Sequence, residues 1–85
     1  MARLKQRFVV RSAEDRMALL KAFDRGDREE LRRLAHSLSG AGGIFGFADI
    51  SQYAAQLEQG IDRGDPLDRL SELLSALAKE IESRQ

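Results

Sequence analysis

The clearest amphipathic pattern in the chain is DREELRRLAHSLSGAGGIFG, residues 27–46. Its apolar residues recur every three or four positions, which predicts a helix with one buried face. That face carries Leu31, Leu34, Ala35, Leu38 and Gly42. At about 100° per residue, the side chain of His36 points roughly 150° away from the centre of this face. The sequence therefore predicts that the only histidine of the chain is exposed to solvent.

Two further helices are indicated after this segment. Asp49 with Gln52 three residues later resembles a capping box, and Phe47 is the alternative start of the same helix. Asp65 followed by Pro66 predicts an N-cap with proline at the first helical position. The predicted buried faces are Ile50, Tyr53, Ala54, Leu57 and Ile61 in the first of these helices, and Leu67, Leu70, Leu74, Leu77 and Ile81 in the second.

The apolar residues of the N-terminal segment fall on two different helix faces. One set is Ala13, Met17 and Leu20, and the other is Leu4, Phe8, Leu19 and Phe23. A break in the helix near Ser12, capped together with Asp15 three residues later, would reconcile the two sets. We therefore expect the first helix to be broken or bent near Ser12.

Short connections define the predicted topology. Asp27 with Glu30 forms a capping-box-like start of the helix that carries His36. The glycines that stand where helices would end in the left-handed conformation are Gly26, Gly46 and Gly64. The repeated Asp-Arg-Gly-Asp at 24–27 and 62–65 is interpreted as helix ends and not as an adhesion motif. Because short connections make consecutive helices antiparallel, we predict an all-α, up-down-up-down four-helix bundle, with residues 1–85 forming a single domain.

Composition argues against several classes of function. A chain of 85 residues has room for one small core, and its 14 basic and 14 acidic side chains cancel. No global field therefore favours nucleic acid or an anionic membrane as a partner. The chain has no cysteine and one histidine, which argues against a zinc site or thiol chemistry. No apolar run approaches the ~20 residues of a membrane span. We expect a cytoplasmic, monomeric domain without a cofactor or metal of its own.

The exposed face around the histidine carries groups suited to an anion. Within about one turn of His36 on that face lie Arg32, Arg33, Ser39, Gly40 and Gly43. A neutral imidazole is a competent nucleophile near pH 7. The arginines would screen a phosphoryl group, and the hydroxyl of Ser39 would hydrogen-bond it. The alternative is that Arg32 and Arg33 pair with Glu29, Glu30 or solvent, as charges on a helix face usually do.

Glycines follow the histidine at Gly40, Gly42 and Gly43. Each costs a helix about 1 kcal/mol relative to alanine, so each calls for an explanation. Gly42 lies near the apolar face, which predicts the close approach of a neighbouring helix. Gly40 and Gly43 lie on the histidine side, where they leave one flank of the imidazole accessible. The alternative is that the helix ends early, near Ala41.

The same residues resemble a known family. His36, Leu38, Gly40 and Gly46 are similar to the signature of histidine-containing phosphotransfer (HPt) domains, which are modules of two-component phosphorelays. The similarity extends over residues 8–82. Its other matching positions are Asp27, Leu31, Ala35, Leu57, Glu58, Gly64 and Asp65.

The resemblance implies the four-helix fold and a phosphorelay function. His36 would accept a phosphoryl group through Nε2 from a receiver-domain aspartate, or from a kinase, and pass it to another receiver aspartate. The implied partners are response-regulator receiver domains, a hybrid sensor histidine kinase, or both, and the receiver would supply Mg²⁺. No ATP-dependent kinase activity is implied. Ser39 stands where the family most often has lysine, which puts the support of the phosphohistidine in doubt unless Arg32 or Arg33 replaces that charge.

Two other interpretations remain open. A non-catalytic module with the same fold would bind a receiver or a kinase without taking phosphate, and Ser39 in place of lysine favours it. A structural bundle would instead dimerise through apolar residues left over from the core. The candidates for that contact are Val9, Val10, Phe45 and Phe47.

Overall fold

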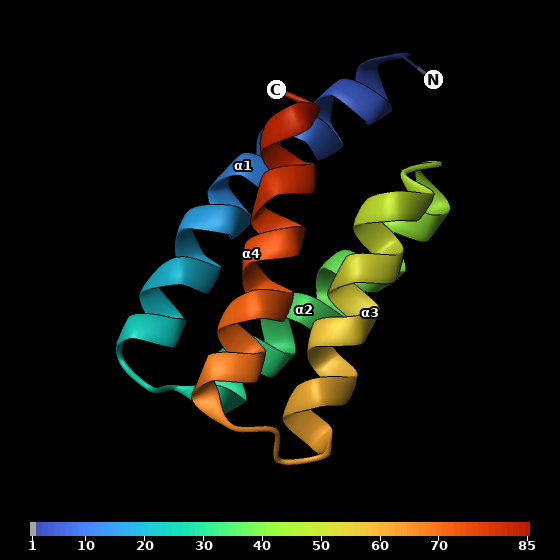
Figure 1. Ribbon diagram of the computed structural model, residues 1–85. Helices are drawn as coiled ribbons and strands as arrows, with labels where there is room; N and C mark the ends of the chain where they lie inside the picture. Colours follow the sequence, from blue (N-terminus) through green and yellow to red (C-terminus); the bar gives the residue numbers. More distant parts are fainter. Residues whose placement is uncertain (1) are drawn as a thin grey trace.

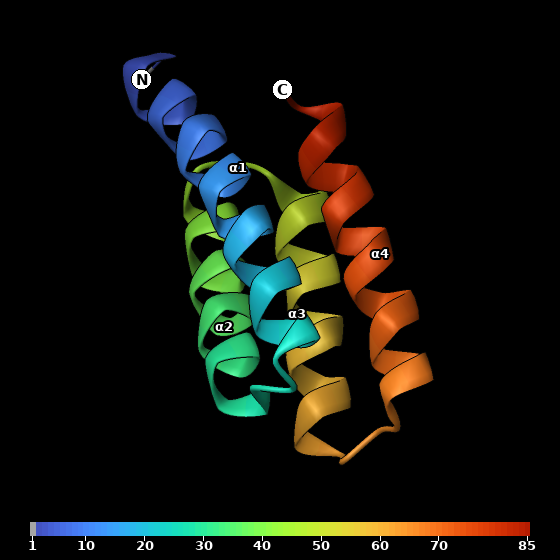
Figure 2. The ribbon, with the colours of Figure 1, turned by 90° about the vertical axis from the view of Figure 1, so that its left-hand side faces the viewer.

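The computed structural model describes residues 2–85, which fold into four α-helices. They are α1 (Ala2–Asp24), α2 (Arg28–Ile44), α3 (Ala48–Asp62) and α4 (Leu67–Ser83). Consecutive helices run antiparallel, and α4 closes the bundle by packing against α1 (Figures 1 and 2). The prediction of an up-down-up-down four-helix bundle is therefore confirmed.

The core runs along the bundle axis and receives side chains from every helix. In α2 the buried residues are Leu31, Leu34, Ala35, Leu38 and Gly42, which is the predicted face. The other buried apolar residues are Phe8, Leu19 and Ala22 in α1, Ile50, Ala54 and Leu57 in α3, and Leu70, Leu73, Leu74, Leu77, Ala78 and Ile81 in α4. Tyr53 and Ile61 are half-buried, whereas Leu67 is exposed, so its predicted burial is wrong.

The predicted break in the first helix is wrong, because α1 runs without interruption from Ala2 to Asp24. Ser12 is buried in the middle of the helix, and its Oγ donates a hydrogen bond to the carbonyl of Val9 at 2.8 Å. The hydroxyl is thus satisfied by the preceding turn of its own helix, so it neither caps a new helix nor requires a break. The two predicted faces are not cleanly separated: Met17 is 51% exposed but Leu20 of the same set packs half-buried against the core, and Phe8 and Leu19 of the other set are buried while Leu4 is exposed.

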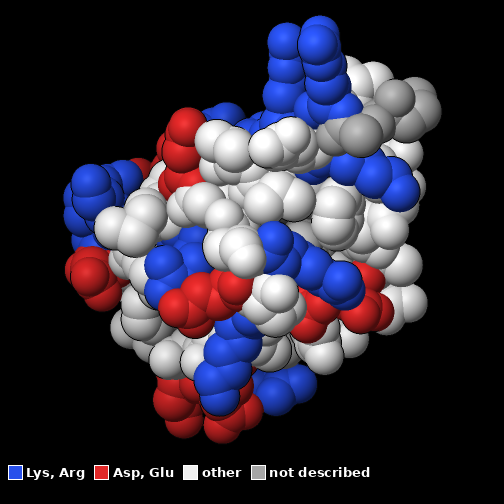
Figure 3. Space-filling model, turned by 90° about the horizontal axis from the view of Figure 1, so that it is seen from above, with Lys and Arg blue, Asp and Glu red and all other residues white. Residues whose placement is uncertain are grey.

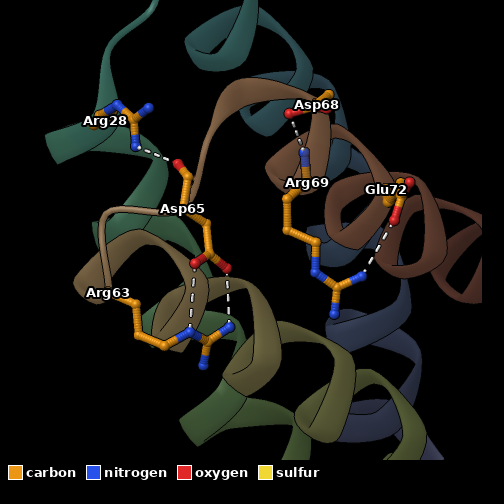
Figure 4. A network of polar contacts seen from close by, with 6 residues as sticks. All are labelled: Arg28, Arg63, Asp65, Asp68, Arg69 and Glu72. Atoms are coloured by element: carbon orange, nitrogen blue, oxygen red, sulfur yellow. Dashed lines mark hydrogen bonds and ion pairs between the residues drawn. The ribbon is translucent and has the colours of Figure 1, made fainter.

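The start of α4 lies one residue later than predicted. Pro66 has extended dihedrals (φ −68°, ψ 161°) and is the N-cap, so the first helical residue is Leu67. The carboxylate of Asp65 does not cap the helix. It accepts hydrogen bonds from Nη2 of Arg63 at 2.9 Å and from Nε at 3.5 Å, while Nη1 of Arg28 donates to the Asp65 carbonyl at 3.2 Å (Figure 4). These contacts join the start of α2 to the connection between α3 and α4.

The start of α3 agrees with the alternative prediction. Phe47 is the N-cap, without a side-chain hydrogen bond, and Asp49 lies inside the first turn, where its charge favours the helix dipole. Gly26, Gly46 and Gly64 have φ of 68°, 82° and 74°, so the predicted left-handed helix ends are confirmed.

Aromatic rings close the end of the bundle where both termini lie. Phe8 of α1 stacks on Phe47 with ring centroids 5.0 Å apart and tilts against Phe45 at 5.6 Å. Both aromatic side chains of the connection between α2 and α3 therefore pack within the bundle instead of forming a free apolar patch. Lys and Arg side chains gather where α1 begins (Figure 3), in a segment that carries Arg3, Lys5, Arg7 and Arg11. Within residues 2–85, no helix is both long and apolar enough to span a bilayer.

Candidate functional site

His36 lies near the middle of α2, on the face opposite the core. The helix is fixed at its start by Asp27, whose Oδ1 accepts a hydrogen bond from the backbone N–H of Glu30 at 3.0 Å. The side chain of His36 is 71% exposed. The predicted exposure of the imidazole is therefore confirmed, and the ring is accessible to a second protein.

A carboxylate from the neighbouring helix holds one nitrogen of the ring. Nδ1 of His36 lies 2.9 Å from Oε2 of Glu58, which α3 presents and whose side chain is only 16% exposed. An ionised carboxylate accepts hydrogen bonds and cannot donate them, so Nδ1 carries the hydrogen of the neutral ring. The lone pair of the neutral ring is then on Nε2.

Glu58 was not among the predicted site residues, although it was one of the positions that resemble the family pattern. The sequence places it directly after Leu57, which belongs to the buried face of α3. That position puts it at the edge of the core, beside another helix. Which residue it meets depends on the register of α3 against α2, and the local pattern carries no information about that register.

Arg32 contacts two carboxylates of α3. Its Nε donates to Oδ1 of Asp62 at 2.7 Å, and its Nη2 lies 3.3 Å from the same Glu58 oxygen that binds His36. The hydrogen bond from Arg32 holds the pKa of Asp62 below its ordinary value, and Asp62 in turn raises the pKa of Arg32. Both groups are therefore charged at neutral pH. Sequence reasoning did not identify Asp62 as a partner.

Arg33 turns toward the start of its own helix. It forms a two-pronged ion pair with Glu30, with Nε to Oε1 at 2.6 Å and Nη2 to Oε2 at 2.8 Å. Hydrogen bonding to Arg33 holds the pKa of Glu30 below its ordinary value. Glu30 therefore does not complete the capping box with Asp27. The alternative interpretation, in which the arginines pair with carboxylates, describes this arrangement, and for Arg33 it named the correct partner.

A surface hollow connects these groups. It is lined by Asp27, Glu29, Glu30, Arg32, Arg33 and His36. Both arginines that line the hollow already contact carboxylates. Among residues 2–85, no cluster of three or more histidine, aspartate or glutamate side chains could hold a metal ion.

The glycines after the histidine have two different surroundings. A Cβ at Gly40 would meet nothing within 4 Å, and one at Gly43 would make only an ordinary contact with Oγ of Ser51 at 3.6 Å. A Cβ at Gly42 would lie 3.1 Å from the backbone nitrogen of Ser51 and 3.3 Å from the carbonyl of Phe47. The predicted close approach of a helix at Gly42 is confirmed. The alternative of an early helix end near Ala41 is wrong, because α2 continues to Ile44.

Ser39 and Ser37 lie on opposite flanks of the histidine. The backbone carbonyl of Ser39 accepts a hydrogen bond from Oγ of Ser51 at 2.7 Å, which ties α2 to α3. Oγ of Ser37 accepts one from Nη2 of Arg11, which ties α2 to α1. Sequence reasoning missed Ser37 and Arg11, since no local pattern links them. Hydrogen bonds to both neighbouring helices thus fix the segment of α2 that carries His36.

Comparison with protein-family models gave a match to the Hpt domain over residues 3–84. Searches of curated proteins and of solved structures gave no significant match. The family match covers almost the whole described chain and agrees with the antiparallel bundle and with the exposed histidine on its second helix. The chain belongs to the Hpt domain family, the histidine phosphotransfer domains of two-component phosphorelays.

Proposed function

We propose that His36 is the phosphoacceptor of this domain and that it reacts through Nε2. The observation that carries the proposal is the pairing of a 71% exposed ring with a carboxylate at Nδ1. In the transfer step, the Nε2 lone pair attacks the phosphorus of a receiver aspartyl phosphate, or of a phosphorylated kinase. The bond from phosphorus to the donor breaks, and the donor carboxylate, or the donor histidine of a kinase, leaves with the bonding electron pair. Return to a second receiver aspartate is the same step in reverse.

Glu58 assists this step by holding the ring and by balancing its charge. Attack through Nε2 places positive charge on the imidazole, and the carboxylate stands 2.9 Å from Nδ1 to offset it. The contact between Glu58 and Arg32 helps to keep this carboxylate oriented. The result is a nucleophile that presents the same nitrogen to every partner.

The remaining predicted site residues have supporting roles in the proposal. Gly40 leaves open space beside the imidazole, in which the tetrahedral phosphoryl group and the surface of a partner are accommodated. Gly43, one turn further along α2, likewise places no side chain on this face. The hydroxyl of Ser39 is the neutral donor for a phosphoryl oxygen, while Arg32 and Arg33 supply positive charge only when they release their carboxylates.

The partners in this proposal are receiver domains of response regulators, a hybrid sensor histidine kinase, or both. Bound Mg²⁺ on the receiver would neutralise charge on the phosphoryl group during transfer. This chain contributes the positioned nucleophile and the surface around it. The step needs only a phosphorylated donor, so the proposal assigns no ATP-dependent kinase activity to this chain.

A radiolabelled transfer experiment tests the proposal. The protein is mixed with phosphorylated receivers, and label on the domain is followed with time in the wild type and in His36→Gln. We expect stoichiometric, acid-labile phosphate on the wild type and none on the variant. Melting temperatures should agree, because an exposed side chain contributes little to stability. Label retained by His36→Gln would overturn the proposal. Binding of receivers without any transfer would support the alternative, a docking module, which Ser39 in place of lysine favours.

A further inference from the structure

Two contacts between α2 and α3, one ion pair and one hydrogen bond, lie one turn apart. On α2, Arg32 and His36 are four residues apart and share a face, and on α3 Asp62 and Glu58 are four residues apart and face them. Asp62 binds Arg32 at 2.7 Å, and Glu58 binds His36 at 2.9 Å. The second contact is used directly by the reaction proposed above, whereas the first limits the charge that Arg32 can offer to it.

Arg32 is the cation most directly connected to the reactive ring, since it contacts the same Glu58 oxygen. Its guanidinium is nevertheless already paired with carboxylates of α3. Nε and Nη2 are occupied by Asp62 and Glu58, and Nη1 has no partner among residues 2–85. The only other arginine that lines the hollow, Arg33, is held by Glu30. A phosphoryl group that arrives at His36 therefore meets no unpaired cation in the hollow.

We propose that Asp62 is a positioning residue that withholds Arg32 from the phosphoryl group on His36 and thereby lowers the affinity of the site for that group. The inference rests on the proposed function, because it takes the phosphoryl group to be bound at His36. Its consequence is a phosphohistidine that is readily passed on: with weak electrostatic support at His36, the transfer equilibrium shifts toward the receiver aspartate.

The physical reason is the charge balance of the site. A phosphoryl group adds close to two negative charges, and Asp62 competes with it for the same guanidinium. Replacing Asp62 by asparagine removes the competitor and keeps the size of the side chain. Arg32 then gains by turning to the phosphoryl oxygens. An exposed ion pair of this kind changes an equilibrium constant by about two- to five-fold, because water screens it.

The equilibrium can be measured without a receiver, with N-phosphoimidazole as the phosphoryl donor. Nε2 of His36 attacks the phosphorus, the P–N bond of the protonated donor breaks, and neutral imidazole leaves, so bonds and protons balance. Wild type and Asp62→Asn are equilibrated with the donor and excess imidazole, and ³¹P NMR gives the ratio of phospho-His36 to N-phosphoimidazole. We expect the equilibrium constant to rise about two- to five-fold in Asp62→Asn.

Asp49→Asn is the matched control, because Asp49 lies in the same helix and pairs with an arginine, Arg84. It lies nine residues, or about 14 Å along α3, from Glu58, which contacts His36. Because this exceeds the screening length of about 8 Å, we expect no change in the equilibrium constant. In an Arg32→Gln background, Asp62→Asn should lose its effect. An unchanged or lower constant in Asp62→Asn, or the same increase in the Arg32→Gln background, would overturn the role of Asp62. A wild-type protein that takes up no phosphoryl group would instead overturn the proposed function itself.

Discussion

Replacing Glu58 by glutamine isolates the charge that the structure places next to the reactive ring. Glutamine keeps the size of the side chain and still offers an oxygen to Nδ1 of His36, which lies 2.9 Å from the present carboxylate. The substitution therefore removes the negative charge without removing the acceptor. The expected losses are the stabilisation of positive charge that develops on the imidazole during attack and the ion pair between Glu58 and Arg32.

The size of the expected loss in Glu58→Gln follows from the solvent exposure of Glu58 and His36. Hydrogen bonds to charged groups contribute about 1.5–3 kcal/mol when they are well protected from water. Here Glu58 is 16% exposed but His36 is 71% exposed, so solvent screens part of the interaction. A loss of about 1 kcal/mol is a reasonable value for this geometry, and it corresponds to a rate reduced by about five-fold.

The assay is the initial rate of phosphoryl uptake by His36 from N-phosphoimidazole, followed by ³¹P NMR. Glu72→Gln serves as the control, because Glu72 lies on α4 in an exposed ion pair with Arg69 (Figure 4). We expect the control to match the wild type and Glu58→Gln to be slower. If Glu58→Gln reacted as fast as the wild type, or faster, the assistance assigned to this carboxylate would be wrong.

Further predictions concern stability. Gly42→Ala should destabilise the fold by about 1–3 kcal/mol, because its Cβ would press on backbone atoms of Ser51 and Phe47 and force the two helices apart. Gly40→Ala should stabilise the fold by up to about 1 kcal/mol, because a Cβ there meets no atom within 4 Å; thermal melts of both variants test the pair. The pKa of Asp62 is lowered from 3.8 by Arg32, so its contribution is complete above about pH 3.8 and is lost as the pH falls through the lower folded-state value. The difference in melting temperature between wild type and Asp62→Asn should therefore shrink in acid, and a constant difference down to pH 2 would contradict this.

Local patterns were sufficient to predict much of the fold. The apolar face of α2 and its cap at Asp27 were predicted correctly, because spacing and capping depend on residues within a few positions of one another. The same reasoning failed at Ser12, where apolar residues on two helix faces and a possible cap with Asp15 suggested a helix break. Its hydroxyl is satisfied by the carbonyl of Val9, which a helix offers at any position along its length.

The site was predictable only in part. The exposure of His36 follows from the periodicity of its own helix, and the sequence predicted it. Its contact with Glu58, and that of Arg32 with Asp62, join residues 22 and 30 positions apart. Such contacts depend on how far α3 is displaced along α2, and a pattern within one helix does not encode that displacement.

The close contact at Gly42 has a consequence for the chemistry of the domain. Gly42 lies about 9 Å from His36 along α2, and there the two backbones meet without an intervening side chain. A bulkier residue at this position would push the start of α3 outward and carry Glu58 with it. If Glu58 assists transfer as proposed, the rate of phosphoryl uptake is thus sensitive to a position that no partner protein needs to touch, and variants there can alter that rate while the surface around His36 keeps its composition.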